Sequence, residues 1–216
     1  MIEGVLFDMD GLMFDTERLW TEAWLETARE EHLPVTLDIV VAMRGRTLTD
    51  CRQVCRAALG EDFDFDTYQE KARVVMARLM NDRGLDKKPG LVELLEELRR
   101  RGLPAVVCTS TRRDTTEQYL RMAGIGGFFK GQICGDEVTR GKPDPEVFLK
   151  GAALAGVAPE RCIVLEDSPN GIRAGAAAGC KAVMVPDLME PTDELRALAA
   201  AIVPDLFAVV PLLDTL

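Results

Sequence analysis

The feature that most constrains the fold is a short apolar run near the start of the chain that ends in two aspartates and a glycine. Residues 4–7 read Gly-Val-Leu-Phe, and Asp8, Met9, Asp10 and Gly11 follow. An apolar run closed by a turn predicts a buried strand, and its carboxylates then lie at the sheet edge where α/β proteins bind ligands. A helix cap needs only one carboxylate, so the pair favours a functional site.

The second half of the chain alternates between apolar runs and amphipathic segments that end at glycines. The runs lie at residues 105–108, 132–134, 163–165 and 182–185. Such alternation predicts a parallel sheet with helices on both faces, whereas residues 15–88 show helical spacing and no convincing strand. The sequence therefore predicts an α/β fold with a Rossmann-like catalytic core, residues 1–14 and 89–216, and a small helical cap domain, residues 15–88, inserted after the first strand.

Composition narrows the classes of function. The net charge of -10 argues against non-specific nucleic-acid binding, and no run approaches the ~18 apolar residues of a membrane span. No basic segment precedes an apolar stretch, so we expect no signal peptide and a cytoplasmic protein. The six cysteines show no zinc pattern and are expected to be reduced thiols. The single histidine, His32, has no neighbours that indicate a Ser-His-Asp mechanism.

Polar side chains follow the predicted strands at several points along the chain. They are Asp8 and Asp10, Thr109 and Ser110, Glu166 and Asp167, and Lys142 in the loop Gly141-Lys142-Pro143-Asp144-Pro145. Each group alone has an ordinary explanation as a strand end, a helix cap or a surface residue. Their order and placement together indicate one site at the carboxyl edge of the sheet.

These groups together suit phosphoryl transfer. A carboxylate such as Asp8 can attack phosphorus and form an acyl phosphate. Mg²⁺, which prefers oxygen ligands, could be held by Asp8, Asp167 and a backbone carbonyl. Lys142 and the Thr109 hydroxyl can bind the phosphoryl oxygens. Asp10 can protonate the leaving alkoxide and later take a proton from water.

The motifs resemble those of the haloacid dehalogenase-like hydrolase superfamily, and more narrowly its β-phosphoglucomutase and sugar-phosphate phosphatase branch. They read DMDGLMFDTE from Asp8, Thr109-Ser110, GKPDP from Gly141 and LEDSPNGI from Leu165. The resemblance covers nearly the whole chain, and it implies a helical cap that opens and closes over the core.

The resemblance also implies roles for individual residues. It implies that Asp8 is the nucleophile, that Asp10 is the general acid and base, and that Thr109 and Lys142 bind the transferring phosphoryl group. It implies a Mg²⁺ site formed by Asp8, the Asp10 carbonyl and Asp167, with Glu166 beside or within it.

The expected cap departs from the mutases of this branch. In β-phosphoglucomutase a histidine stands four residues after the threonine that matches Thr16, whereas this chain has Trp20 there. The loop at residues 43–47 keeps a basic residue before its glycine, but Leu48 stands where the mutase has an arginine. These differences favour a phosphatase. The residues expected to contact substrate are Thr16, Trp20, Arg44, Gly45, Ser110 and Lys142, whereas Trp24 is expected to pack within the cap.

The sequence thus predicts a Mg²⁺-dependent phosphatase that hydrolyses a small phosphomonoester, a sugar phosphate, through an aspartyl phosphate. β-Phosphoglucomutase is the alternative. A signalling receiver would carry its aspartate on a middle strand, a dehalogenase would need neither Asp10 nor a metal site, and a non-catalytic relative would be expected to have lost a motif residue. We expect the partner to be a small phosphorylated metabolite, and the protein to be a monomer that binds neither nucleic acid nor membrane.

Overall fold

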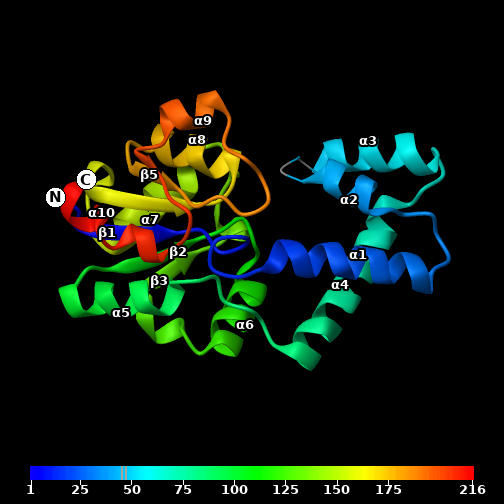
Figure 1. Ribbon diagram of the computed structural model, residues 1–216, viewed down its shortest axis with the longest axis horizontal. Coiled ribbons are helices and arrows are strands. Elements are labelled where there is room, and N and C mark those ends of the chain that lie inside the picture. Colours follow the sequence, from blue (N-terminus) through cyan, green and yellow to red (C-terminus); the bar gives the residue numbers. More distant parts are fainter. Residues whose placement is uncertain (45, 47) are drawn as a thin grey trace. The chain divides into compact units, whose positions relative to one another are not determined.

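The computed structural model describes residues 1–44, 46 and 48–216 (Figure 1). The chain forms two compact units, Met1–Asp15 with Leu85–Leu216, and Thr16–Gly84. The segment 85–88, which leads from the helical unit back to the core, therefore belongs to the first unit, although the sequence analysis assigned it to the insertion. Its backbone pairs with residues 14 and 15, which lead out to the helical unit: Phe14 and Lys87 form an antiparallel bridge, and the Asp15 N–H donates to the Asp86 carbonyl at 3.1 Å.

The first unit is built on a six-stranded sheet in which every neighbouring pair is parallel, in the order β3-β2-β1-β4-β5-β6. The strands are β1 (Gly4–Phe7), β2 (Ala105–Cys108), β3 (Gly131–Ile133), β4 (Cys162–Glu166), β5 (Lys181–Met184) and β6 (Ala201–Ile202). The expected Rossmann-like α/β core is confirmed. The chain builds outward from β1 in one direction and then returns to add β4 on its other side, so the switch point lies between β1 and β4. Ligands of such sheets bind outside the carboxyl ends of the strands at this point.

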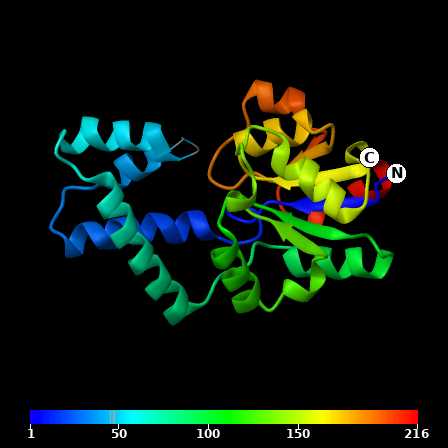
Figure 2. The same ribbon diagram turned by 180° about the vertical axis from the view of Figure 1, so that it is seen from behind.

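Helices cover both faces of the sheet, as alternation along the chain requires. They are α5 (Leu91–Arg101), α6 (Arg113–Ala123), α7 (Glu146–Ala155), α8 (Pro169–Ala177), α9 (Asp193–Leu198) and α10 (Leu212–Thr215). Figures 1 and 2 show α5 and α6 on one side of the sheet and α8 and α9 on the other. The three central strands, β1, β2 and β4, are buried along their whole length, which explains why they read as continuous apolar runs rather than alternating ones.

In the second unit, all regular secondary structure among the described residues is α-helical. It comprises α1 (Thr16–Glu30), α2 (Leu37–Met43), α3 (Leu48–Leu59) and α4 (Phe65–Arg83). The Trp24 ring lies at its centre, 4.9 Å from the Tyr68 ring and 5.7 Å from the Phe65 ring between centroids. The Tyr68 hydroxyl donates to the Trp24 carbonyl at 2.7 Å, which ties α4 to α1. Within the described parts of both units, no helix combines the length and the apolar character that crossing a bilayer requires.

Candidate active site

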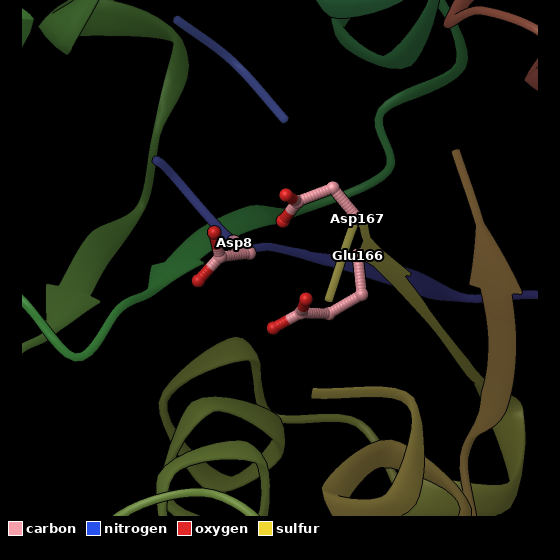
Figure 3. A group of neighbouring side chains, drawn as sticks. All are labelled: Asp8, Glu166 and Asp167. Atoms are coloured by element: carbon pink, nitrogen blue, oxygen red, sulfur yellow. The ribbon is translucent and has the colours of Figure 1, made fainter. Parts of the chain in front are cut away.

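Three carboxylates meet at the carboxyl end of the sheet, at its switch point (Figure 3). Phe7 of β1 lies opposite Leu165 of β4, and the Asp8 N–H donates to the Leu165 carbonyl at 3.0 Å. This register brings one oxygen each of Asp8, Glu166 and Asp167 within 4.8 Å of one another. Asp8 is 7% exposed and Glu166 is fully buried. Carboxylates so close together and so poorly solvated repel one another unless a cation lies between them.

Lys142 provides part of the positive charge that these carboxylates require. Its ammonium donates to Asp8 Oδ1, to Glu166 Oε1 at 2.7 Å and to the Cys108 carbonyl at 3.0 Å. These three acceptors use all three N–H groups of the ammonium. The Phe148 ring packs against the same group, with its centroid 4.9 Å from Nζ. The lysine of the predicted loop is therefore buried within the carboxylate cluster and is not a surface residue.

One ammonium does not neutralise the whole cluster. Burial raises the pKa of Asp8 to about 8; the Lys142 ammonium opposes this shift, and Glu166 and Asp10 add to it. Burial alone would lower the pKa of Lys142, but the charges and hydrogen bonds of Asp8 and Glu166 outweigh it and raise that pKa. Lys142 thus stays charged, and Asp8 needs a second cation to ionise readily at neutral pH. The all-oxygen donor set of Asp8 and Asp167 fits a hard divalent ion such as Mg²⁺.

Glu166 is held from both sides. Its Oε1 accepts from Lys142, while its Oε2 accepts from the Ser168 backbone N–H at 2.9 Å and from the Ser168 hydroxyl at 2.8 Å. Ser168 is also the N-cap of α8, accepting from the Gly171 N–H at 3.1 Å. A Cβ on Gly171 would overlap the Glu166 carboxyl carbon, so only glycine lets α8 approach this closely. These contacts favour a role for Glu166 in positioning Lys142.

Gly11 allows a second close approach. Its φ of +80° is in the left-handed region, which glycine adopts at little steric cost. A Cβ there would overlap the Asp167 carboxylate. The turn after Asp10 can therefore lie directly against Asp167, which explains why the motif needs glycine after its second aspartate.

The end of β2 supplies two threonine hydroxyls. Thr109 is 1% exposed, and its Oγ1 accepts from the Thr111 N–H at 3.0 Å. The Thr111 hydroxyl donates to Asp10 Oδ2 at 2.6 Å. Ser110 lies between them and is exposed. Thr111 is a residue that the sequence analysis did not single out; its only signal was its place in the run Thr109-Ser110-Thr111.

We expect Thr111→Val to lower kcat by about tenfold with little change in KM. A hydrogen bond to a carboxylate contributes about 1.5–3 kcal/mol and favours its ionised, correctly oriented form. The acid limb of the kcat–pH profile should also move to higher pH, because the Asp10 carboxylate loses a donor that favours its ionised form. Thr111→Ser, which keeps the hydroxyl, is the control and should remain close to wild type in both measurements. A tenfold loss of kcat with an unmoved pH profile would assign Thr111 a purely structural role.

We expect Mg²⁺ to raise the Tm more at pH 8 than at pH 5. Asp8 holds its proton at pH 5, and that proton competes with the cation. The apparent affinity for the ion should therefore rise towards pH 8, and stabilisation grows with the ratio of free ion to Kd. Thermal unfolding with Mg²⁺ and with EDTA at the two pH values measures this difference. Asp8→Asn should remove the pH dependence, and equal shifts of Tm at both pH values in the wild type would contradict the assignment.

The other predicted contact residues lie in the second unit. Thr16 begins α1 and is buried, while Trp20 is half-buried on the same helix with its ring 6.1 Å from that of Trp24. Arg44 follows α2 and donates through Nη2 to Thr21 Oγ1 at 3.3 Å. Gly45 lies outside the described residues. Substrate contact by these residues stays a prediction.

Known proteins with similar sequences are found across most of the chain. The sequence model of one family, described as haloacid dehalogenase-like hydrolase, matches residues 2–179. A phosphorylated carbohydrates phosphatase of Thermotoga maritima is 32% identical over 84% of this chain and 84% of its own. Hexitol phosphatase A of Escherichia coli is 30% identical over 85% of this chain and 82% of its own.

A solved structure from Thermotoga maritima, named as a candidate β-phosphoglucomutase, superposes with a TM-score of 0.84 at 28% identity and covers 100% of both chains. The family match and this likeness in fold agree with the topology and with the acidic cluster at the switch point.

Proposed function

The chain belongs to the haloacid dehalogenase-like hydrolase family, and from that premise we propose that it is a Mg²⁺-dependent phosphatase of small phosphomonoesters, acting on a sugar or sugar-alcohol phosphate. The observation that carries the proposal is the buried group of Asp8, Lys142 and Glu166 beside Asp167 at the switch point of the sheet. Relatives named as phosphatases of phosphorylated carbohydrates and of hexitol phosphates support the class of substrate.

The first step transfers the phosphoryl group to Asp8. One carboxylate oxygen forms a bond to phosphorus while the bond between phosphorus and the alcohol oxygen breaks. Asp10 gives its proton to that alcohol oxygen, so the alcohol leaves neutral. Lys142, which stays charged, and the Thr109 hydroxyl stabilise the negative charge on the phosphoryl oxygens. The product of this step is an aspartyl phosphate.

The second step returns Asp8 to its starting state. Asp10, now ionised and oriented by the Thr111 hydroxyl, takes a proton from water. The water oxygen bonds to phosphorus while the bond between phosphorus and the Asp8 oxygen breaks. Inorganic phosphate leaves, which regenerates the Asp8 carboxylate and leaves Asp10 protonated for a second cycle.

Members of this family are hydrolases for which a divalent metal is the general rule, and the donor set at the switch point fits one. We propose that Asp8, Asp167 and the backbone carbonyl of Asp10 hold Mg²⁺. When bound, this ion supplies the positive charge that lets the Asp8 carboxylate approach the anionic phosphoryl group. Both oxygens of Glu166 are already hydrogen-bonded. Glu166 therefore keeps Lys142 in place beside the ion.

We assign the role of a cap to the helical unit Thr16–Gly84. Both of its connections to the core pass through the paired linkers at residues 13–15 and 85–88. A cap that closes during the reaction would exclude bulk water and bring its side chains to the substrate. Thr16, Trp20 and Arg44 are the described cap residues to which we assign substrate contact, with Ser110 on the core.

β-Phosphoglucomutase activity is the second candidate, and the likeness to a structure named as a candidate mutase favours it. A mutase must transfer the phosphoryl group of Asp8 to a sugar hydroxyl instead of water. The chain has Trp20 where those mutases carry a histidine, so the residue that would help activate the sugar hydroxyl is missing. We therefore place hydrolysis first.

The test is phosphate release from a panel of hexose phosphates, hexitol phosphates and other small phosphomonoesters, with Mg²⁺ and with EDTA. We expect release that requires the metal and is strongest for a sugar or sugar-alcohol phosphate. Conversion of β-glucose 1-phosphate to the 6-phosphate in the presence of a bisphosphate primer, without net release, would instead establish the mutase. Inactivity in both assays would overturn the proposed function and leave the family assignment intact.

A further inference from the structure

The loop that carries Lys142 is closed into a ring by one side chain. Glu146 begins α7, directly after the loop, and its carboxylate turns back to the residues that precede the loop. Its Oε2 accepts from the Arg140 N–H at 3.0 Å, and both of its oxygens accept from the Thr139 N–H at 3.0 Å. The two ends of the segment 139–146 are therefore joined, with Lys142 between them.

Hydrogen bonds within this ring fix the turn itself. The Asp144 N–H donates to the Gly141 carbonyl at 3.0 Å, and the Glu146 N–H donates to Asp144 Oδ1 at 3.1 Å. Asp144 Oδ2 also lies 3.0 Å from Nε of Arg140. Because its ends and its turn are both held, the loop has little freedom to shift the backbone of Lys142.

The helix that Glu146 begins is itself packed closely on the sheet. A Cβ on Gly151 of α7 would lie 2.3 Å from the sulfur of Cys108 on β2, so glycine allows this close approach. The Cys108 carbonyl accepts from the Lys142 ammonium, and the Phe148 ring of α7 packs against that ammonium. Through Glu146, the loop of Lys142 is thus fixed to the helix that packs beside the acceptors of its side chain.

Lys142 depends on this support because it reaches the carboxylate cluster from a loop. Its ammonium ends a flexible aliphatic stem, and its acceptors are Asp8, Glu166 and the Cys108 carbonyl, which end or follow three neighbouring strands. A displacement of about 1 Å in a catalytic group can lower the rate by about 100-fold. The position of the loop backbone therefore limits how well the ammonium reaches its acceptors.

The Glu146 carboxylate has a second partner, whose effect must be separated from that of the loop. Lys150, one turn further along α7, donates to Glu146 Oε1 at 2.6 Å. This hydrogen bond and those from the backbone N–H groups of Thr139 and Arg140 lower the pKa of Glu146 to about 2, so the carboxylate is ionised at neutral pH. The pair with Lys150 is partly exposed to water, which weakens it.

We propose that Glu146 is a positioning residue for Lys142, acting through the backbone of residues 139–140 and not through its ion pair with Lys150. The inference rests on the proposed function in one respect, the binding of the transferring phosphoryl group by Lys142. In this role Glu146 contacts neither substrate nor metal; it holds the loop so that the ammonium stays within the carboxylate cluster.

The Lys142 ammonium offers a direct readout that requires no activity. A buried ammonium whose N–H groups are all hydrogen-bonded exchanges slowly with water, so metal-free protein labelled with ¹⁵N-lysine shows its N–H signal, which Lys142→Met assigns. We expect Glu146→Met, which has no acceptor for the backbone N–H groups, to lose or broaden this signal. Glu146→Gln keeps a carbonyl oxygen and should retain the signal, as should Lys150→Met. An unchanged signal in Glu146→Met, or its loss in Lys150→Met, would overturn the inference.

Steady-state kinetics then measure what this positioning contributes to the reaction. With Mg²⁺ and the best substrate of the panel, Glu146→Met should lower kcat/KM by about 100-fold, the effect of a displacement of about 1 Å. Glu146→Gln and Lys150→Met should stay within about threefold of wild type, because each retains an acceptor for the two backbone N–H groups. Equal losses in Glu146→Met and Glu146→Gln would assign the effect to the charge of the carboxylate and overturn the inference.

Failure of this inference and failure of the proposed function give different results. Absence of phosphate release by the wild-type protein would overturn the proposed function, whereas the ammonium signal would still test the positioning of Lys142. A lower Tm in Glu146→Met with an unchanged signal would make Glu146 merely structural and overturn the inference. If Glu146→Met does not fold, Glu146→Asp decides, because its shorter side chain cannot reach both N–H groups: loss of the signal is expected, and an unchanged signal would contradict the assignment.

Discussion

Asp8→Asn is expected to abolish phosphate release while leaving the protein folded. The asparagine amide cannot form the acyl phosphate, so the covalent route is closed, and loss of a nucleophile lowers kcat by about 10,000-fold or more. The substitution keeps the size of the side chain and an oxygen that can accept from Lys142. Phosphate release with the best substrate of the panel measures the effect. Asp62→Asn, at an exposed position of the helical unit, is the control and should retain full activity.

The same substitution should stabilise the metal-free protein, and more so at pH 8 than at pH 5. Burial raises the pKa of Asp8 from 3.8 to about 8. At a pH between these two pKa values, the folded state holds a proton that the unfolded state releases, so the stability of the fold decreases as pH rises. Asparagine has no such proton and removes the penalty. Thermal unfolding in EDTA at both pH values tests this; a Tm of Asp8→Asn below wild type at pH 8 would show that the Asp8 carboxylate stabilises the fold.

Lys142→Met is expected to remove both activity and stability. The methionine side chain fills similar space but leaves Asp8, Glu166 and the Cys108 carbonyl without the donor that they share. Removal of one partner from a buried ion pair destabilises by about 3–5 kcal/mol. The loss should be larger at pH 8 than at pH 5, because the remaining carboxylates can take up protons at the lower pH. Urea unfolding at the two pH values measures it.

Two further variants separate charge from packing at Lys142. Lys150→Met removes an exposed lysine that pairs with Glu146 on α7, and such pairs contribute only about 0–1 kcal/mol. Adding Glu166→Gln to Lys142→Met should restore part of the stability and none of the activity, because it removes one of the two stranded carboxylates. Equal losses in Lys142→Met and Lys150→Met would contradict the view that the buried ammonium balances the cluster.

Much of the fold followed from local patterns. The continuous apolar runs predicted the central strands because both faces of those strands are buried. Helices α5, α6 and α7 end at Gly102, Gly124 and Gly156, as the amphipathic segments that end at glycines predicted, because a terminal glycine acts on the backbone nearby. β6 (Ala201–Ile202) had no distinct signal, since two residues carry no period. The structure groups the segment 85–88 with the core, which local patterns do not encode because its pairing partner lies some 70 residues earlier.

The sequence by itself determined which groups could do chemistry: the aspartates after the first strand, the lysine of the Gly-Lys-Pro loop and the acidic pair after β4. Only the tertiary structure decided what each group touches. Lys142 and Asp8 are 134 residues apart in the chain and Thr111 and Asp10 are 101 apart, so strand order, which local spacing does not encode, sets these contacts. Side-chain identity is local information, whereas burial, charge balance and hydrogen-bond partners are properties of the folded chain.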